Sequence, residues 1–234
     1  MERDLLLDIR RPAARIRNVL LGSCVALSAF AASPEPNIDR TPGEDNAATQ
    51  AIAQLRLSDT LADFGEKNAD PLAFIEAAKI RKLLPPPLSS ADPVDPHSWQ
   101  TLLDCAAQLA GSNKSVMALI ADVRRLKPRD IPVIPTGVTL LNKQVKQNSA
   151  DRAEVRFSAG EVAMVYVRPM TSADLDLFVY DDLNNLICSG GGAEHNAQCR
   201  WRPRRDGSFL IDVRNNTQAE VNYELAISRE SVPH

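Results

Sequence analysis

The sequence predicts a segregated α+β protein, in which a small four-helix domain precedes an antiparallel β-sandwich of the jelly-roll or Greek-key type. Apolar residues recur at helical spacing between residues 47 and 127. From about residue 152 to residue 228, short stretches instead alternate between apolar and polar residues, with turn residues between them. Helices and strands do not alternate along the chain, which argues against a parallel βαβ sheet.

The helical domain is expected over residues 47–127. Its four helices are predicted at 47–67, 71–84, 98–110 and 114–127. Asp70 and Pro71 are typical of a helix start, and Gly111 is typical of a helix end. Leu72 and Leu119 belong to apolar stripes that we expect to face inward.

The β-sandwich domain is expected over residues 138–230. Its strands are predicted at 138–141, 161–167, 174–180, 209–214 and 221–227. The polar residues 143–151 predict a turn, and residues 32–46 and 128–137 have the composition of linkers.

The N-terminus is typical of an export signal. Several arginines precede an apolar run at residues 19–32, which is too short to span a bilayer comfortably. Small residues at positions 29 and 31 predict a signal peptide over residues 1–31, cleaved near Ala31, and a periplasmic or secreted protein. A retained membrane anchor is one alternative. Residues 21–24 also resemble a lipobox, which would make Cys24 a lipid anchor.

Charge and composition exclude some classes of partner. The chain has a formal net charge of −3, and removal of residues 1–31 takes away five arginines and three acids, which leaves about −5. Such a protein offers no positive field for nucleic acid or anionic lipid, so a membrane is expected only through the signal peptide or lipidation. The aromatic content of 5% argues against a large aromatic surface for carbohydrate.

Three cysteines follow the predicted cleavage site. Cys188 and Cys199 flank a glycine-rich loop, and in an oxidising compartment we expect them to form a disulfide. The alternatives are two buried thiols, or a zinc site that would also use His195. Cys105 lies on an apolar helical face and is expected in the core.

An acidic strand and the turn after it form a candidate calcium site, because calcium prefers clustered carboxylate and amide oxygens. The candidate ligands are Asp174, Asp176, Asp181, Asp182 and Asn184. The alternative is that these side chains bond nearby backbone groups in the turn, or pair with Arg168 or Arg214 across strands.

A basic stretch forms a candidate ligand-binding edge, because arginine beside tryptophan is typical of interface hot spots. It comprises Arg200, Trp201, Arg202, Arg204 and Arg205, with His195 in the neighbouring loop 190–196. The alternative places Trp201 in the core and the arginines in a solvated turn that discourages edge pairing.

Three stretches of the β region resemble the bacterial pre-peptidase C-terminal domain family. They are 157–167 (FSAGEVAMVYV), 173–187 (ADLDLFVYDDLNNLI) and 201–213 (WRPRRDGSFLIDV), and their order and spacing match as well as their composition. The resemblance covers about a third of the chain. The resemblance implies an accessory β-sandwich of an exported protein, which binds or positions; some relatives bind calcium or collagen-like substrates. The helical half resembles no family.

The sequence therefore predicts an exported, non-enzymatic protein with a helical docking domain and a sandwich that binds an envelope protein or polysaccharide. No peptidase precedes the sandwich, and neither H-E-x-x-H nor G-x-S-x-G occurs in the chain. The alternatives are a calcium-stabilised structural or envelope-maintenance module, and a hydrolase with an unrecognised site.

Overall fold

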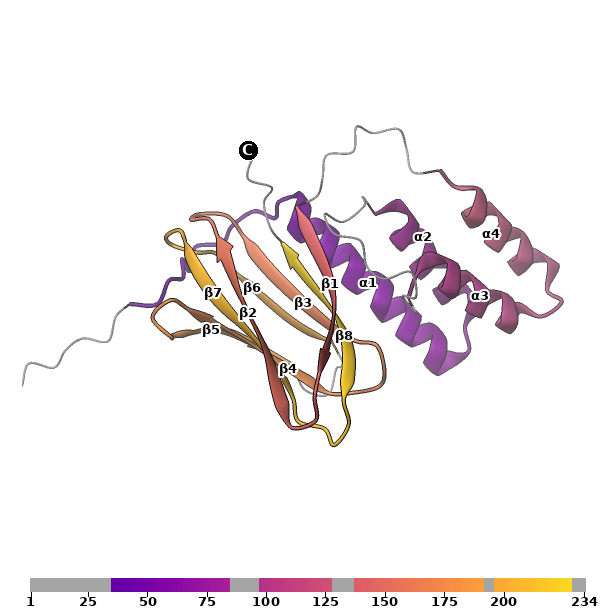
Figure 1. Ribbon diagram of the computed structural model, residues 1–234. Coiled ribbons are helices and arrows are strands. Elements are labelled where there is room, and N and C mark those ends of the chain that lie inside the picture. Colours follow the sequence, from indigo (N-terminus) through magenta and orange to yellow (C-terminus); the bar gives the residue numbers. More distant parts are fainter. Residues whose placement is uncertain (1–34, 85–96, 128–136, 192–195, 229–234) are drawn as a thin grey trace, which may run out of the picture. The chain divides into compact units, whose positions relative to one another are not determined.

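The computed structural model describes residues 35–84, 97–127, 137–191 and 196–228. Within these ranges four helices precede eight antiparallel strands in two sheets, which confirms the segregated α+β prediction (Figure 1). None of the described helices is long and apolar enough to cross a membrane. The predicted signal peptide, Cys24 and His195 lie outside the described residues.

The four helices begin where the sequence places their capping residues. They are α1 (Ala47–Asn68), α2 (Pro71–Leu83), α3 (Trp99–Ala110) and α4 (Lys114–Arg125). Each is preceded by a polar side chain that accepts a backbone N–H of the first turn, as Asp70 does from Leu72 at the start of α2. A helical core between them includes Phe74, Leu103 and Ile120.

Several leucines of the predicted inward stripes are instead exposed. Leu72 of α2 and Leu119 of α4 expose 52% and 46% of their surface, and both line an open groove between these two helices. The apolar stripe on each helix is therefore wider than the face that its neighbours cover.

The strands form two four-stranded sheets. They are β1 (Val138–Val145), β2 (Ser149–Phe157), β3 (Ala163–Pro169), β4 (Leu175–Asp181), β5 (Leu186–Gly190), β6 (Ala197–Trp201), β7 (Gly207–Asn215) and β8 (Val221–Ser228). The first sheet has the order β1-β8-β3-β6, and the second has the order β2-β7-β4-β5. Every connection except that between β4 and β5 passes from one sheet to the other, which is the arrangement of a jelly roll.

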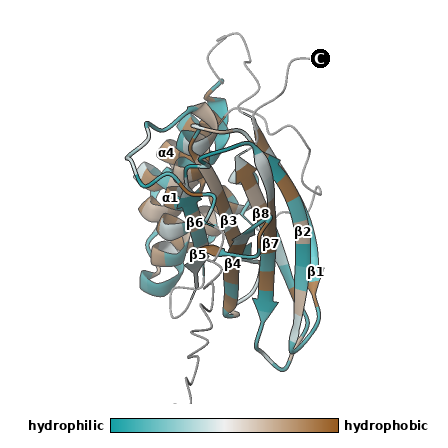
Figure 2. Ribbon diagram, turned by 90° about the vertical axis from the view of Figure 1, so that its left-hand side faces the viewer, coloured by the Kyte–Doolittle hydropathy of each residue, from teal (hydrophilic) through white to brown (hydrophobic). Residues whose placement is uncertain are grey.

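Side-chain alternation along the strands builds the sandwich core. In β4, Leu175, Leu177 and Val179 point inward, and the residues between them are partly exposed, as the alternation predicted. Changes in hydropathy colour along β2 follow the same alternation (Figure 2).

The expected polar turn at residues 143–151 is wrong. β1 continues to Val145 and β2 begins at Ser149, so only residues 146–148 turn the chain. Asn148 has a positive φ of 47°, a conformation that asparagine tolerates. Both strands are edge strands, and polar residues such as Lys143, Gln144 and Asp151 occupy their joined ends, which is why this stretch is similar in composition to a loop.

The helices and the sandwich share a third apolar cluster. Ile52 and Leu55 of α1 pack with Met164 and Tyr166 of β3 and Ala226 of β8, all buried. Consequently β3 is buried along its whole length, with alternate residues facing the sandwich core and α1. The outer face of the first sheet is thus covered by α1.

Candidate binding surface

The predicted arginine edge lies against residues 35–46, which we call the N-terminal strap. Acidic side chains of the strap pair with the arginines in reverse order along the two segments. The pairs are Glu35 with Arg204 at 2.5 Å, Asp39 with Arg202 at 3.2 Å, and Asp45 with Arg200 at 3.0 Å. A ligand of these arginines would therefore compete with the strap.

Asn37 fixes the strap to the sandwich. Its side-chain oxygen accepts the backbone N–H groups of Arg204 at 3.0 Å and Arg205 at 2.9 Å, and its amide group donates to the carbonyl of Arg205. Its own backbone N–H donates to Asp181 at 2.8 Å. Asn37 is buried, so the described part of the segment predicted as a linker is packed and hydrogen-bonded.

Trp201 and Arg205 of the predicted edge also have partners within the chain. Trp201 is buried in the sandwich core, with its ring 4.9 Å from that of Phe157 and 5.3 Å from that of Phe209. Arg205 forms a bidentate pair with Asp182, at 2.8 and 3.2 Å. The alternative prediction, tryptophan in the core, describes its position.

In the acidic turn, the Asp181 carboxylate is hydrogen-bonded to backbone groups. Asp181 accepts hydrogen bonds from the backbone N–H groups of Asn37, Leu183 and Asn185, and from the Asn185 side chain. Burial alone would raise the pKa of Asp181, but these hydrogen bonds outweigh it and lower the pKa. Both oxygens of this carboxylate are therefore already engaged.

The other predicted calcium ligands do not converge on Asp181. Asp176 accepts a hydrogen bond from Asn216 at 2.7 Å, Asp182 pairs with Arg205, and Asn184 sits in the turn with a φ of 61°. In the described parts of the chain, no group of three or more histidine, cysteine or acidic side chains is placed to hold a metal ion. Calcium binding at Asp174–Asn184 stays a prediction.

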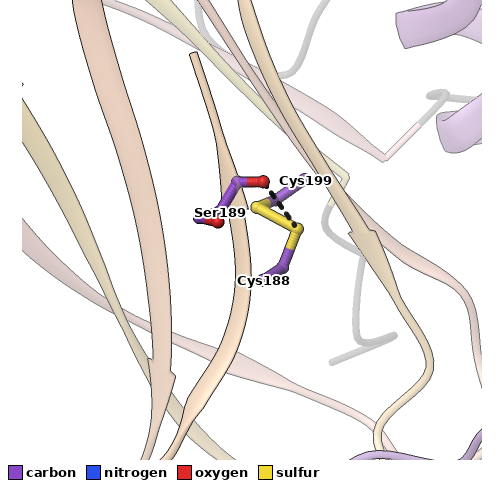
Figure 3. Close-up of a disulfide and its surroundings, with 3 residues drawn as sticks. All are labelled: Cys188, Ser189 and Cys199. Carbon is purple, nitrogen blue, oxygen red and sulfur yellow. Dashed lines mark hydrogen bonds between the residues drawn. A yellow bond between two sulfur atoms is a disulfide. The ribbon is translucent and has the colours of Figure 1, made fainter. Parts of the chain in front are cut away.

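The disulfide between Cys188 and Cys199 is confirmed (Figure 3). It joins β5 of the second sheet to β6 of the first, with 5.7 Å between the Cα atoms. The two strands approach closely here, since a Cβ added at Gly190 would lie 2.4 Å from the carbonyl oxygen of Gln198. The bridge excludes both sulfurs from the zinc site considered above. Cys105 is a free, partly buried thiol beside the helical core.

A buried charge cluster joins α1 and α2 to the first sheet. Asp59 of α1, fully buried, contacts Arg81 of α2 at 2.5 Å and His97 at 2.9 Å, and it accepts the Tyr166 hydroxyl at 2.8 Å. Arg168 of β3 lies 3.6 Å from Asp59, and its other end lies 3.5 Å from Glu224 of β8.

The protonation states of Asp59 and Tyr166 are determined by the neighbouring charges and by burial. Burial would raise the pKa of Asp59, but Arg81, His97 and Arg168 outweigh it and hold the pKa well below its ordinary value. Burial and the adjacent Asp59 carboxylate raise the pKa of Tyr166 above its ordinary value. Asp59 therefore stays ionised and Tyr166 stays neutral, which suits an anchor better than a proton-transfer site.

The outer face of the second sheet carries a set of ordered side chains that the sequence analysis did not single out. We call it the platform; it comprises Arg152 of β2, Phe178 and Tyr180 of β4, and Leu210, Asp212 and Arg214 of β7. The strand registers bring these residues together, since Asp212 lies between Arg152 and Phe178, and Leu210 lies opposite Tyr180. The alternation in β4 already indicated that Phe178 and Tyr180 face outward.

Arg214 contacts three other residues of the platform. Its guanidinium donates two hydrogen bonds to Asp212, at 2.8 and 3.1 Å, and one to the Tyr180 hydroxyl at 3.1 Å. The same group lies over the Phe178 ring, 4.2 Å from its centre. The Phe178 and Tyr180 rings are stacked, with centres 6.4 Å apart. Asp212 is buried, whereas Arg214, Phe178 and Tyr180 are partly exposed yet fixed, and such preorganisation lowers the entropy cost of binding.

No protein-family model matches the chain, and no curated protein matches it. Among solved structures, the chain is similar to the pre-peptidase C-terminal domain of a collagenase from Bacillus anthracis, with 13% identity and a TM-score of 0.33. The match covers 38% of this chain and 87% of that one. The sequence motifs described above resemble the family to which this domain belongs.

Two further solved structures are similar over a comparable part of the chain. One is a mitogen derived from Yersinia pseudotuberculosis, with 12% identity and a TM-score of 0.34, covering 42% of this chain and 89% of that one. The other is a periplasmic inhibitor of g-type lysozyme from Aeromonas hydrophila, with 15% identity and a TM-score of 0.32, covering 40% and 87%. Likeness at this level does not extend to a ligand.

Proposed function

We propose that the protein is an exported, non-enzymatic binding module that captures a ligand of the cell envelope on the platform of its second sheet. The observation that carries this proposal is the difference between the two outer faces of the sandwich. The first face is covered by α1 and its buried charges. The second holds two partly exposed aromatic rings around an arginine whose position is fixed.

Export is supported by the disulfide and by the sequence of residues 1–31. Disulfides persist in oxidising compartments such as the periplasm, and are rare where thiols are kept reduced. The bridge between Cys188 and Cys199 joins edge strands of two different sheets, so that it serves as a structural clamp.

A non-enzymatic role is supported by the properties of the buried group of ionisable side chains around Asp59. Catalytic acids and bases need pKa values close to the working pH. Asp59 and Tyr166 are shifted in the opposite sense, away from neutrality, and both are buried. This cluster is better suited to hold the helices on the sandwich.

The helical unit offers a second surface, which favours its expected role in docking a partner. Leu72 and Leu119 are exposed on either side of a groove of about 350 Å³, with Ile75 and Val123 along it. An apolar helix face fits such a groove. Replacing both exposed leucines with aspartate should release a helix-docked partner without loss of platform binding.

The proposal is tested by capture from envelope fractions. The tagged full chain is expressed in a bacterial host, and bound material is compared for wild type and the double variant Phe178→Ala/Tyr180→Ala. The double variant should lose capture, because it removes both rings, while its melting temperature stays within a few degrees. Phe64→Ala is the matched control, since Phe64 is an exposed aromatic residue of α1 away from the platform. Equal capture by all three proteins would contradict the proposal.

A further inference from the structure

The chemistry of the platform narrows the class of ligand. We propose, on the basis of the proposed function, that the platform binds a pyranose polysaccharide, with sugar rings packed against the exposed parts of Phe178 and Tyr180 and sugar hydroxyls bonded to Arg214. A peptide, a small molecule and a charged polymer each require something different from what the platform offers.

A peptide would gain little at this place. β4 lies between β7 and β5, and β7 lies between β2 and β4, so the backbone groups beneath the platform are already paired in the ladder. Extended peptides obtain their affinity from free backbone groups at a sheet edge, and helical peptides from an apolar groove. Apart from Arg152 of the edge strand β2, the platform lies on the face of two interior strands and offers side chains alone.

A small molecule is also a poor match. Small ligands bind in concave sites that bury most of their surface. The platform residues project from adjacent positions on one sheet face, in rows that run across β2, β7 and β4. Such a surface suits a chain of repeating units, in which many weak contacts add together.

The platform combines aromatic rings with a fixed hydrogen-bond donor. A pyranose presents an apolar C–H face that packs on an aromatic ring, and hydroxyls at its rim that both donate and accept. Arg214 uses Nε and Nη2 within the chain, which leaves Nη1 without a hydrogen-bond partner among the described residues. Asp212 is buried and pairs with Arg152 and Arg214, so it positions the arginines and does not itself reach a ligand. One donor is thus fixed beside the rings.

Electrostatic attraction alone does not account for this surface. Arg152 and Arg214 share the carboxylate of Asp212, so the three charges leave about one net positive charge. Exposed charges are screened by salt, and a polymer held mainly by charge would be released at high ionic strength. The platform is small, with two rings, which agrees with the low aromatic content of the chain.

The test uses the same full chain and envelope fractions, treated beforehand with sodium periodate, which cleaves vicinal diols of sugars, or with proteinase K. Capture should be lost after periodate and survive both proteinase K and an increase from about 50 mM to about 500 mM NaCl. Cellohexaose, whose glucose units carry the vicinal diols that periodate cleaves, should compete, and the double variant should bind this oligosaccharide at least about tenfold more weakly.

Tyr180→Phe provides a milder variant, because it keeps the ring and removes only the hydroxyl that accepts from Arg214. It should fold as wild type and bind more weakly, by a smaller factor than the double variant. Capture that depends on Phe178 and Tyr180 but survives periodate would overturn the polysaccharide inference and leave the platform as a binding surface. Capture that is indifferent to both rings would instead overturn the proposed function.

Discussion

Strands β3 and β4 lie in different sheets of one sandwich, and their outer faces differ in how far they are exposed to solvent. Along β3, every residue is buried, because Met164, Tyr166 and Arg168 face α1. Along β4, every second residue is partly exposed, and Phe178 and Tyr180 face solvent. Both strands obey the same alternation, so the difference comes from what covers them.

The two faces carry arginines with different roles: Arg168 stabilises the fold, and Arg214 is accessible to a ligand. Arg168 is buried and lies between two acids of different elements, whereas Arg214 is 38% exposed at its side chain and leans on aromatic rings. A buried arginine cannot be released without leaving an acid unpaired. An exposed arginine whose orientation is already fixed loses little conformational entropy when it binds a ligand.

The largest effect is expected from breaking the covered face. Asp59→Ala removes the carboxylate shared by Arg81, His97 and Tyr166 and leaves buried positive charge, so the free energy of unfolding should fall by about 3–5 kcal/mol. Urea denaturation measures this. Asp104→Ala is the control, because its pair with Arg124 is exposed, and it should cost less than about 1 kcal/mol. Equal losses would refute the anchoring role.

The stability that Asp59 contributes should depend on pH. Because the pKa of Asp59 is lowered in the folded state, its contribution is present above the ordinary aspartate pKa and is lost as pH falls below about 4. The stability gap between wild type and Asp59→Asn should therefore narrow on acidification, as followed by unfolding curves at several pH values. A gap that widens in acid would show the opposite sign of linkage.

A smaller effect is expected where the two sheets are joined. Reduction of the Cys188–Cys199 bridge, which closes a loop with a sequence separation of 11, should lower stability by about 2–3 kcal/mol. Melting with and without a phosphine reductant measures the loss. The Cys188→Ser/Cys199→Ser variant should melt like the reduced protein and ignore the reductant, although it retains the Cys105 thiol.

The smallest effect is expected from calcium. Asp181 is occupied by four donors and Asp182 by Arg205, so the melting temperature should be the same in chelator and in excess calcium. If calcium raised the melting temperature and Asp181→Asn abolished this increase, the result would support the predicted calcium site.

Local signals explain how far the sequence predicted this fold. Helix caps such as Asp70 and the alternation in β4 depend on neighbours in the chain, and both were found where predicted. The place of Asp59 depends on partners 22 and 107 residues away, Arg81 and Tyr166, so a charged residue in the middle of an apolar helix face was the only available sign.

The binding surface was harder to predict for the same reason. The basic stretch 200–205 was singled out because its arginines are adjacent in sequence, but the strap that covers them begins more than 150 residues earlier. The platform is assembled from β2, β4 and β7, which bring Arg152, Phe178 and Arg214 together only through strand pairing. Composition along the chain does not reveal such a set.

The most direct test of the account is hydroxyl-radical footprinting of the full chain, with and without a solubilised envelope fraction. Phe178 and Tyr180 should become protected from oxidation when ligand is present, while Phe64 on α1 keeps its reactivity. Protection confined to the helical side chains, with Phe178 and Tyr180 unchanged, would contradict the claim that the open face of the second sheet is the ligand-binding surface.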